Sequence, residues 1–288
     1  MYKRQALDDL PSALPIQTYS GGYTHPISAL MATESNTAQI LLAASKKTLV
    51  VSDLLTAQVV RRLQGHTGRI NALTAADRGE AFLTASYDGT VSIWDGRSRD
   101  TKPIQVLREA KDSVTDVFTV QSDTGGGSVA AAGLICTASV DGVVRSYDLR
   151  KGLLKSDDCG SPISSMARTH DGQCLAISCL DGTIRLMEID TGELLNTYSG
   201  FHKSGQFGLE VAILADDATI ATGSEDGACI LYDLVWANHV QSLEASTRPM
   251  CSIATHPQKS SVIITASYDG STIVWSNDST WEKQLVRD

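Results

Sequence analysis

Three side chains in the first third of the chain could do chemistry together: His66, Ser86 and Asp88. A serine hydroxyl, a histidine base and a carboxylate that orients the histidine are the groups of a serine hydrolase. Such a triad works only if the hydroxyl lies within hydrogen-bond reach of the imidazole. The elements that position these residues therefore decide whether they are catalytic.

The serine and the aspartate belong to a phrase, SYDGTVSIWD at 86–95, that recurs along the chain. Related copies are SVDGVVRSYD at 139–148, CLDGTIRLME at 179–188, SEDGACILYD at 224–233 and SYDGSTIVWS at 267–276, after a degraded AASKKTLVVSD at 43–53. The copies end near residues 53, 95, 148, 188, 233 and 276. A regular period of this length indicates a repeat architecture. The later copies do not all come with a histidine, and this scatter argues against a catalytic triad.

Each repeat reads as short β-strands joined by tight turns. Segments such as RINALT (69–74), AFLTAS (81–86) and TVSIWD (90–95) are rich in β-branched residues and bounded by Gly, Asp and Ser. The Asp-Gly pair in five copies predicts a hairpin whose glycine has a positive φ. A fourth strand, for example PIQVLREA at 103–110, completes one small antiparallel sheet. Because these strands are apolar on both faces, each sheet must pack between two others, which predicts a β-propeller.

The repeat resembles the WD-repeat family, in which a Gly-His pair opens the unit and Trp-Asp closes its third strand. The matching residues are Gly65, His66, Ser86, Asp88, Trp94 and Asp95. More narrowly, residues 16–276 are similar to the mitogen-activated protein kinase organizer family. That likeness is carried by WDGRSRDTKPIQVL (94–107), VDGVVRSYDLRKG (140–152), GSPIS (160–164), DGQC (171–174), DTGELL (190–195), SEDG (224–227) and THP (255–257).

The resemblance implies a structural role for the tempting triad. In the WD-repeat pattern His66, Ser86, Asp88 and Trp94 form a buried hydrogen-bond network: the aspartate accepts from the histidine, the histidine meets the hydroxyl, and the hydroxyl reaches the indole. A later set, His202, Ser224, Asp226 and Tyr232, is expected to be partial. The resemblance also implies a non-catalytic interaction scaffold that gathers kinases of a mitogen-activated cascade and spliceosomal proteins.

The expected fold is an all-β WD-repeat propeller with six recognisable four-stranded blades, over residues 15–288. The family's pattern has seven repeats, so we expect the first blade to be missing, by truncation or in a true six-bladed ring. Residues 1–14 are expected to be a disordered extension. The last blade could take its outer strand from STWEKQLVRD (279–288) or from PIQTYSGG (15–22), and the sequence leaves both open.

Composition excludes several functions. The 288-residue chain carries a formal net charge of −9 and no basic cluster, so we expect no direct nucleic-acid contact. It contains no stretch resembling a membrane span or a signal peptide, so we expect a cytoplasmic or nuclear protein. Its six cysteines are scattered and read as free buried thiols, and no Cys/His spacing suits a metal. No phosphate-binding loop is present, and we expect no cofactor.

Function is then expected in the loops on the side of the Asp-Gly turns, because the sheets are committed to packing. Aromatic and cationic residues there are the types enriched at binding hot spots. The partner-binding candidates are Tyr23, Arg69, Tyr87, Lys203, Arg248 and Tyr268. The alternative is a hydrolase that uses the central channel, for which the first strands offer only Asn71, Asp116 and Glu210.

Overall fold

The computed structural model describes residues 3–6, 17–19, 23–34, 39–76, 80–120, 134–148, 151–244 and 246–277. It divides the chain into two compact units: unit I, residues 16–163, and unit II, residues 1–15 with 164–288. Throughout the described ranges the regular structure is β-strand, with no helix. We expected a single domain over 15–288, and this stays a prediction.

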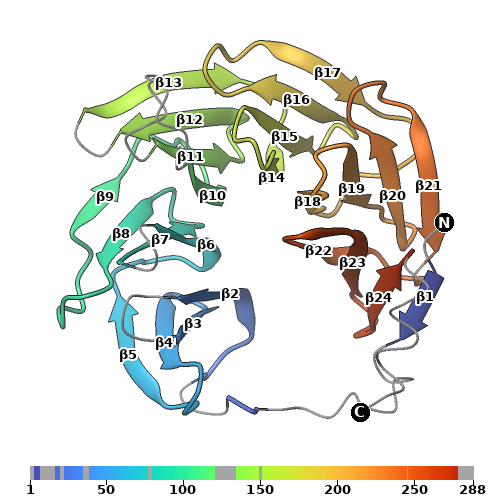
Figure 1. Cartoon of the computed structure of the whole chain (residues 1–288). Helices are drawn as coiled ribbons and strands as arrows, with labels where there is room; N and C mark the ends of the chain where they lie inside the picture. The colour runs from blue at the N-terminus through green and yellow to red at the C-terminus, as the bar shows by residue number, and fades with distance from the viewer. Residues whose placement is uncertain are drawn as a thin grey trace. The chain divides into compact units, whose positions relative to one another are not determined.

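Unit I contains three four-stranded antiparallel sheets, drawn in blue to green in Figure 1. We call them blades 1, 2 and 3. Blade 1 consists of β2 (Ile27–Glu34), β3 (Gln39–Ser45), β4 (Thr48–Asp53) and β5 (Val59–Gln64). Blade 2 consists of β6 (Ile70–Ala76), β7 (Ala81–Ser86), β8 (Val91–Asp95) and β9 (Gln105–Leu107). Blade 3 consists of β10 (Val114–Val120), β11 (Leu134–Ser139), β12 (Val143–Asp148) and β13 (Gly152–Asp158).

Unit II contains three further sheets of the same kind, blades 4, 5 and 6. Blade 4 consists of β14 (Ile163–Arg168), β15 (Cys174–Cys179), β16 (Ile184–Glu188) and β17 (Leu194–Tyr198). Blade 5 consists of β18 (Val211–Ile213), β19 (Thr219–Gly223), β20 (Ala228–Asp233) and β21 (His239–Glu244). Blade 6 consists of β22 (Met250–His256), β23 (Lys259–Ser267), β24 (Thr272–Ser276) and β1 (Lys3–Ala6).

The predicted fold class is therefore confirmed as all-β, with six four-stranded blades of the β-propeller type. The third strand of each blade ends at the residue where we placed the repeat end: 53, 95, 148, 188, 233 and 276. The five Asp-Gly turns have the positive φ that the sequence predicts, between 76° and 87° at Gly89, Gly142, Gly182, Gly227 and Gly270.

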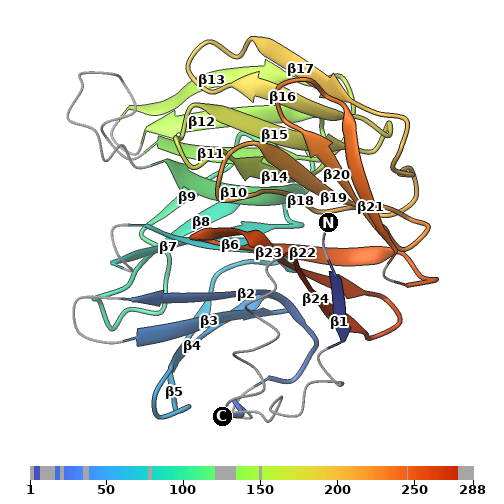
Figure 2. The same cartoon turned by 45° about the vertical axis from the view of Figure 1, so that its right-hand side comes forward.

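The outer strand of blade 6 corrects two expectations. It is β1, which pairs antiparallel with β24 from Lys3 opposite Ser276 to Ala6 opposite Ile273, and Figure 2 shows the two side by side. The expected disorder of residues 1–14 therefore does not hold for this segment. Of the first proposed donor, 15–22, only residues 17–19 are described, and they are not in a strand; the second, 279–288, lies outside the described residues. An edge strand such as β24 offers unpaired backbone groups that can pair with an extended segment of almost any sequence. The residues KRQA therefore carry no signal that they form this strand.

Apolar side chains fill the space between neighbouring blades within each unit. On β8, Ile93 packs in the cluster that joins blades 2 and 3, and the adjacent Trp94 packs in the cluster that joins blades 1 and 2. Successive side chains of a strand point to opposite faces, so one blade serves two interfaces. In unit II, Tyr232 faces blade 4 and Leu231 faces blade 6 in the same way. The double-sided apolar pattern in the sequence is thus explained by packing.

Candidate functional site: the turn aspartates and the loop surface

Blade 2 holds the hydrogen-bond network that the sequence suggested. His66, in the loop before β6, places its Nδ1 3.1 Å from Asp88 Oδ2 in the β7–β8 turn. Its Nε2 lies 2.8 Å from the hydroxyl of Thr84, on β7. The indole Nε1 of Trp94, on β8, donates to the same hydroxyl at 2.9 Å. His66, Thr84 and Trp94 are buried, so the network joins three elements in a dry environment.

The hydroxyl in this network is Thr84 and not Ser86, which corrects our assignment. Ser86 Oγ instead donates to the carbonyl of Arg69 at 2.9 Å and accepts from the amide of Asp88 at 3.2 Å. The two hydroxyls are two residues apart on β7 and so face the same way, but it is Thr84 that the indole of Trp94 reaches. Ser86 therefore makes no hydrogen bond with His66, and the three groups are not arranged as nucleophile, base and orienting acid.

Burial and hydrogen bonds determine the charge states of Asp88 and His66 in blade 2. Burial opposes ionisation of Asp88, but donors outweigh it: Thr90 Oγ1 at 2.6 Å, the amides of Thr67 and Gly68 at 2.8 and 3.3 Å, and His66. Together they hold the pKa of Asp88 well below its usual range. Burial lowers the pKa of His66, although Asp88 acts against it. A neutral imidazole with its proton on Nδ1 satisfies every partner, with Thr84 donating to Nε2.

The turn aspartate is present in blades 2 to 6, and each blade gives it a different partner. In blade 3, Arg145 pairs with Asp141 at 2.7 Å, with both side chains buried. In blade 4, Arg185 pairs with Asp181 at 2.6 Å in a more exposed setting. In blade 6, Ser246 Oγ donates to Asp269 at 2.5 Å, and hydrogen bonds from Ser246 and Ser271 lower the pKa of Asp269 to about 2. The histidine is one of several solutions to the same requirement, which is to satisfy the turn carboxylate.

Blade 5 shows the partial set that we expected around His202. Its Nδ1 lies 2.8 Å from the hydroxyl of Tyr232, which occupies the place of Trp94. Asp226 does not bond the histidine and instead lies 3.6 Å from the ammonium of Lys203. Ser224 Oγ accepts from the amide of Lys203 at 2.9 Å. The Nε2 of His202 is buried without a hydrogen-bond partner among the described atoms.

Polar residues on the first strands link one blade to the next. Ser28 Oγ donates to the carbonyl of Ile70 at 2.6 Å, and Asn71 Nδ2 donates to the carbonyl of Val114 at 2.8 Å. In unit II, Glu210 accepts from Ser252 Oγ and from the amide of Ile253 at 2.7 and 3.0 Å. Burial raises the pKa of Glu210, although these two donors act against it.

Two of the three groups on which a channel hydrolase would depend are therefore engaged in contacts between blades. Asn71 and Glu210 join neighbouring first strands, as just described. Asp116 accepts from the amide of Val117 at 2.8 Å. Among the described residues, no group of three or more His, Cys, Asp or Glu side chains could hold a metal ion. Four of the six free cysteines are buried and two are half-buried.

In unit I the structure brings two of the partner-binding candidates together. The amide of Tyr87 donates to the carbonyl of Arg69 at 2.8 Å, so the β7–β8 turn is fixed against the start of β6. Tyr87 is 69% exposed and Arg69 is also exposed, whereas Tyr23, before β2, is half-buried. Tyr87 thus presents a ring from a backbone held in place, which lowers the entropy lost on binding.

In unit II the loops of blades 5 and 6 form a second surface, which we call the Phe207 patch: Lys203, Phe207, Arg248 and Tyr268. The rings of Phe207 and Tyr268 lie 5.7 Å apart. Glu225 accepts from the amide of Phe207 at 3.0 Å, and Ser267 Oγ donates to the carbonyl of Arg248 at 3.2 Å. Our sequence reasoning missed Phe207, although an aromatic residue in the polar loop KSGQF (203–207) was a usable signal.

These features define the class of the protein before any comparison is made: recurrent four-stranded blades, Asp-Gly turns and a His-Asp-Thr-Trp network. Family models agree. The model described as "WD domain, G-beta repeat" matches residues 57–95 and 237–276, and one described as "Anaphase-promoting complex subunit 4 WD40 domain" matches 147–215. The chain is a WD-repeat protein of the β-propeller class.

Comparison with whole proteins narrows this class. The chain is 30% identical over 267 residues to the WD repeat domain-containing protein 83 homolog of Dictyostelium discoideum, covering 86% of this chain and 81% of that protein. It is 37% identical over 188 residues to the rat WD repeat domain-containing protein 83, and 34% identical over 181 residues to the human one. Those alignments cover 55% and 53% of the two mammalian proteins. The chain belongs to the WD repeat domain-containing protein 83 family.

No helix within the described residues is long and apolar enough to cross a membrane.

Proposed function

We propose that this chain is a non-catalytic protein–protein interaction scaffold, acting in the cytoplasm, the nucleus or both. By the resemblance to the mitogen-activated protein kinase organizer family, its partners are members of a mitogen-activated kinase cascade, spliceosomal proteins or both. A scaffold acts by raising the effective concentration of one partner near another, which needs binding surfaces and no reactive groups.

One observation carries the proposal: the exposed aromatic and cationic loop residues stand on backbone that internal hydrogen bonds hold rigid. Tyr87 and Tyr268 are 69% and 60% exposed, yet their amides donate to the carbonyls of Arg69 and Pro249 at 2.8 and 3.1 Å. In blade 2, His66, Ser86 and Asp88 form hydrogen bonds that hold the loop and turn carrying Arg69 and Tyr87. Rigid aromatic anchors are characteristic of binding hot spots.

Affinity purification with mass spectrometry tests the proposal on both units. The test variants are Arg69→Glu with Tyr87→Ala, and Arg248→Glu with Tyr268→Ala. The matched controls are Leu55→Ala and Trp236→Ala, which remove 76% and 75% exposed apolar side chains from the β4–β5 and β20–β21 turns, at the opposite ends of their blades. We expect cascade kinases or spliceosomal proteins with the native chain, a several-fold loss with at least one test variant, and no loss with the controls. Recovery of neither class, or an equal loss with the controls, would contradict the proposal.

A further inference from the structure

Blade 1 departs from the other blades at the β3–β4 turn. Where the other five carry a three-residue turn with an aspartate, blade 1 has only Lys46 and Lys47, between the paired residues Ser45 and Thr48. Lys46 has a φ of 53°, a left-handed conformation that few side chains other than Asn and Asp adopt readily. The charge at this turn is thus reversed relative to the rest of the chain.

The reversal matters because the turn carboxylate accepts hydrogen bonds in every other blade, whatever its side-chain partner. In blade 2, Asp88 receives the amides of Thr67 and Gly68 and the hydroxyl of Thr90. By strand register, Thr24, His25 and Thr48 of blade 1 stand where Thr67, Gly68 and Thr90 stand in blade 2. Blade 1 therefore keeps the surroundings of an anion and lacks the carboxylate that would fill them.

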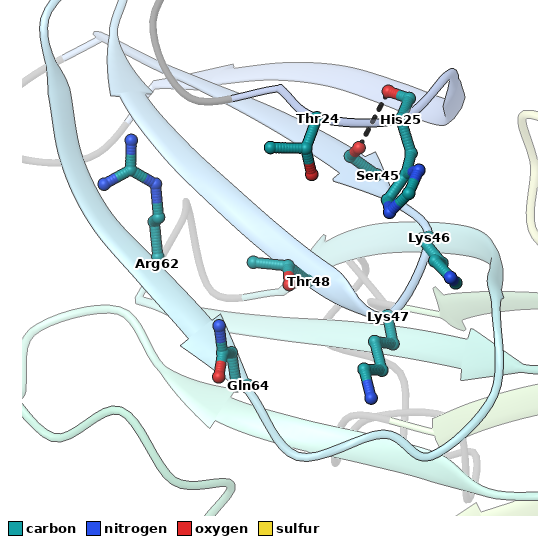
Figure 3. Close-up of a pocket in the computed structure, with 8 residues that line it drawn as sticks. All are labelled: Thr24, His25, Ser45, Lys46, Lys47, Thr48, Arg62 and Gln64. Carbon is teal, nitrogen blue, oxygen red and sulfur yellow. Dashed lines mark hydrogen bonds between the residues drawn. The ribbon is translucent and has the colours of Figure 1, made fainter.

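A pocket of about 380 Å³ opens at this position (Figure 3). Four of its lining side chains are basic: His25, Lys46, Lys47 and Arg62. The figure shows His25 and the two lysines at one end and Arg62, on the neighbouring strand β5, at the other. The pocket is also lined by neutral donors, namely the hydroxyls of Thr24 and Thr48 and the amide of Gln64. The pocket's volume is within the range of about 300–1,000 Å³ that is usual for small-ligand sites.

The loop that forms one wall is tied to the strand behind it. The hydroxyl of Ser45 donates to the carbonyl of His25 at 2.9 Å, drawn as the dashed line in Figure 3. On either side of the turn, Ser45 pairs with Thr48 in the β3–β4 ladder, and Thr48 pairs with Gln64 in the β4–β5 ladder. The basic side chains therefore project from backbone with a fixed geometry, as a binding site requires.

The described residues that line the pocket offer these basic groups no acidic partner. No aspartate or glutamate lines the pocket, and the ion pairs found among the described residues involve other side chains. This concentration of positive charge occurs in a chain whose formal net charge is −9. Lys46, Lys47 and Arg62 carry like charges on one pocket, and a bound anion would lower the repulsion among them.

We propose that this pocket of blade 1 binds a phosphate monoester, whose oxygens take the place that the turn carboxylate occupies in the other blades. A carboxylate offers one charge and two oxygens. A phosphate monoester carries about −1.5 to −2 at neutral pH and three acceptor oxygens, which suits a pocket lined by several cations and hydroxyls. Arginine and lysine are the side chains that proteins most often use for phosphate. This inference does not depend on the proposed scaffold role.

Calorimetric titration of the full chain at low salt tests the site, with O-phosphoserine, inorganic phosphate and unmodified serine as probes. The variants are Lys47→Glu and Arg62→Gln, both at exposed positions where folding should be unaffected. The control is Lys151→Glu, which changes the charge as Lys47→Glu does, at an exposed lysine in the β12–β13 turn. We expect O-phosphoserine to bind, serine not to bind, and each pocket variant to lose at least tenfold in affinity while the control loses less than twofold. Added salt should weaken binding, because the attraction is between charges.

The two probes separate the sources of the phosphate. Tighter binding of O-phosphoserine than of inorganic phosphate supports the proposal, because the phosphate is then recognised on an organic molecule. Equal or tighter binding of inorganic phosphate would overturn the monoester in favour of a free-phosphate site. The proposal is overturned if neither probe binds, or if Lys151→Glu weakens binding as much as the pocket variants do.

Discussion

Blades 2 and 5 start from nearly the same residues and arrive at different networks. Both have a histidine before the first strand, a threonine on the second strand and an aspartate in the turn. In blade 2 these groups connect in one line, from Asp88 through His66 and Thr84 to Trp94. In blade 5 the line is broken: the histidine bonds only a tyrosine hydroxyl, and the aspartate turns to Lys203.

The residue that makes the difference is the aromatic one on the third strand. An indole carries a single donor and reaches the threonine, which leaves the threonine proton for the histidine. The hydroxyl of Tyr232 stands at the far end of its ring and lies 2.8 Å from Nδ1 of His202. It therefore takes the hydrogen bond that Nδ1 makes with the turn aspartate in blade 2. Thr222 is then left to bond the carbonyl of Gly223 at 3.3 Å. A motif of matching letters therefore does not ensure a matching network, and variants can test this reading.

The largest expected effect is on Thr84, compared with Thr222. Thr84→Val keeps the shape of the side chain but leaves the buried Trp94 N–H and His66 Nε2 without partners. At about 1–3 kcal/mol for each unsatisfied group, we expect a loss of about 3 kcal/mol in the free energy of unfolding. Thr222→Val removes a single long hydrogen bond and should cost less than about 1 kcal/mol.

Urea denaturation of both variants measures this difference, and Thr84→Ser is the control because it keeps the hydroxyl. Equal losses for the two valine variants would show that the blade 2 network contributes no more than the blade 5 set.

The second effect is on the two turn aspartates. Asp88→Ala removes an acceptor shared by His66, Thr90 and two loop amides, so we expect a loss of about 2 kcal/mol. Asp226→Ala removes a 3.6 Å contact to a lysine whose side chain is 74% exposed, and one exposed 3.3 Å hydrogen bond from the amide of Ala228. Exposed pairs contribute about 0–1 kcal/mol, so we expect a smaller loss than for Asp88→Ala. The midpoints of thermal unfolding of the two variants measure this difference in stability. A larger drop for Asp226→Ala would break the comparison.

Part of this was predictable because it is local. The repeat ends and the positive φ of the Asp-Gly glycines follow from the residue types and their spacing. The contact of His66 with Asp88 was implied by the resemblance to the WD-repeat pattern. Ser86 could not be separated from Thr84 in the same way, since both face one side of β7. The choice between them depends on how far an indole reaches from β8, which is a fact of packing and not of sequence.

Other features were missed for two different reasons. Arg145 and Arg185 each lie four residues after a turn aspartate, as DGVVR and DGTIR, so a pattern search could have found both ion pairs. The pairing of β1 with β24 joins residues from opposite ends of the chain. No local signal marks it, because a long-range strand pair is selected by the edge it completes.

The smallest expected effect is on the pH dependence of stability. Burial lowers the pKa of both His66 and His202 from the usual value near 6.5, but Asp88 opposes the shift at His66 while no charge opposes it at His202. A histidine with a lowered folded pKa binds its proton more readily in the unfolded state, so stability is full above about pH 6.5 and falls as the pH drops below it. One such group changes the unfolding free energy by at most about 1.4 kcal/mol per pH unit. We therefore expect His202→Gln to flatten the loss of stability between about pH 6.5 and 5 more than His66→Gln does, in urea denaturation at several pH values. The same flattening in both variants would mean that Asp88 does not offset the effect of burial on the pKa of His66, and the electrostatic distinction between the two blades would fail.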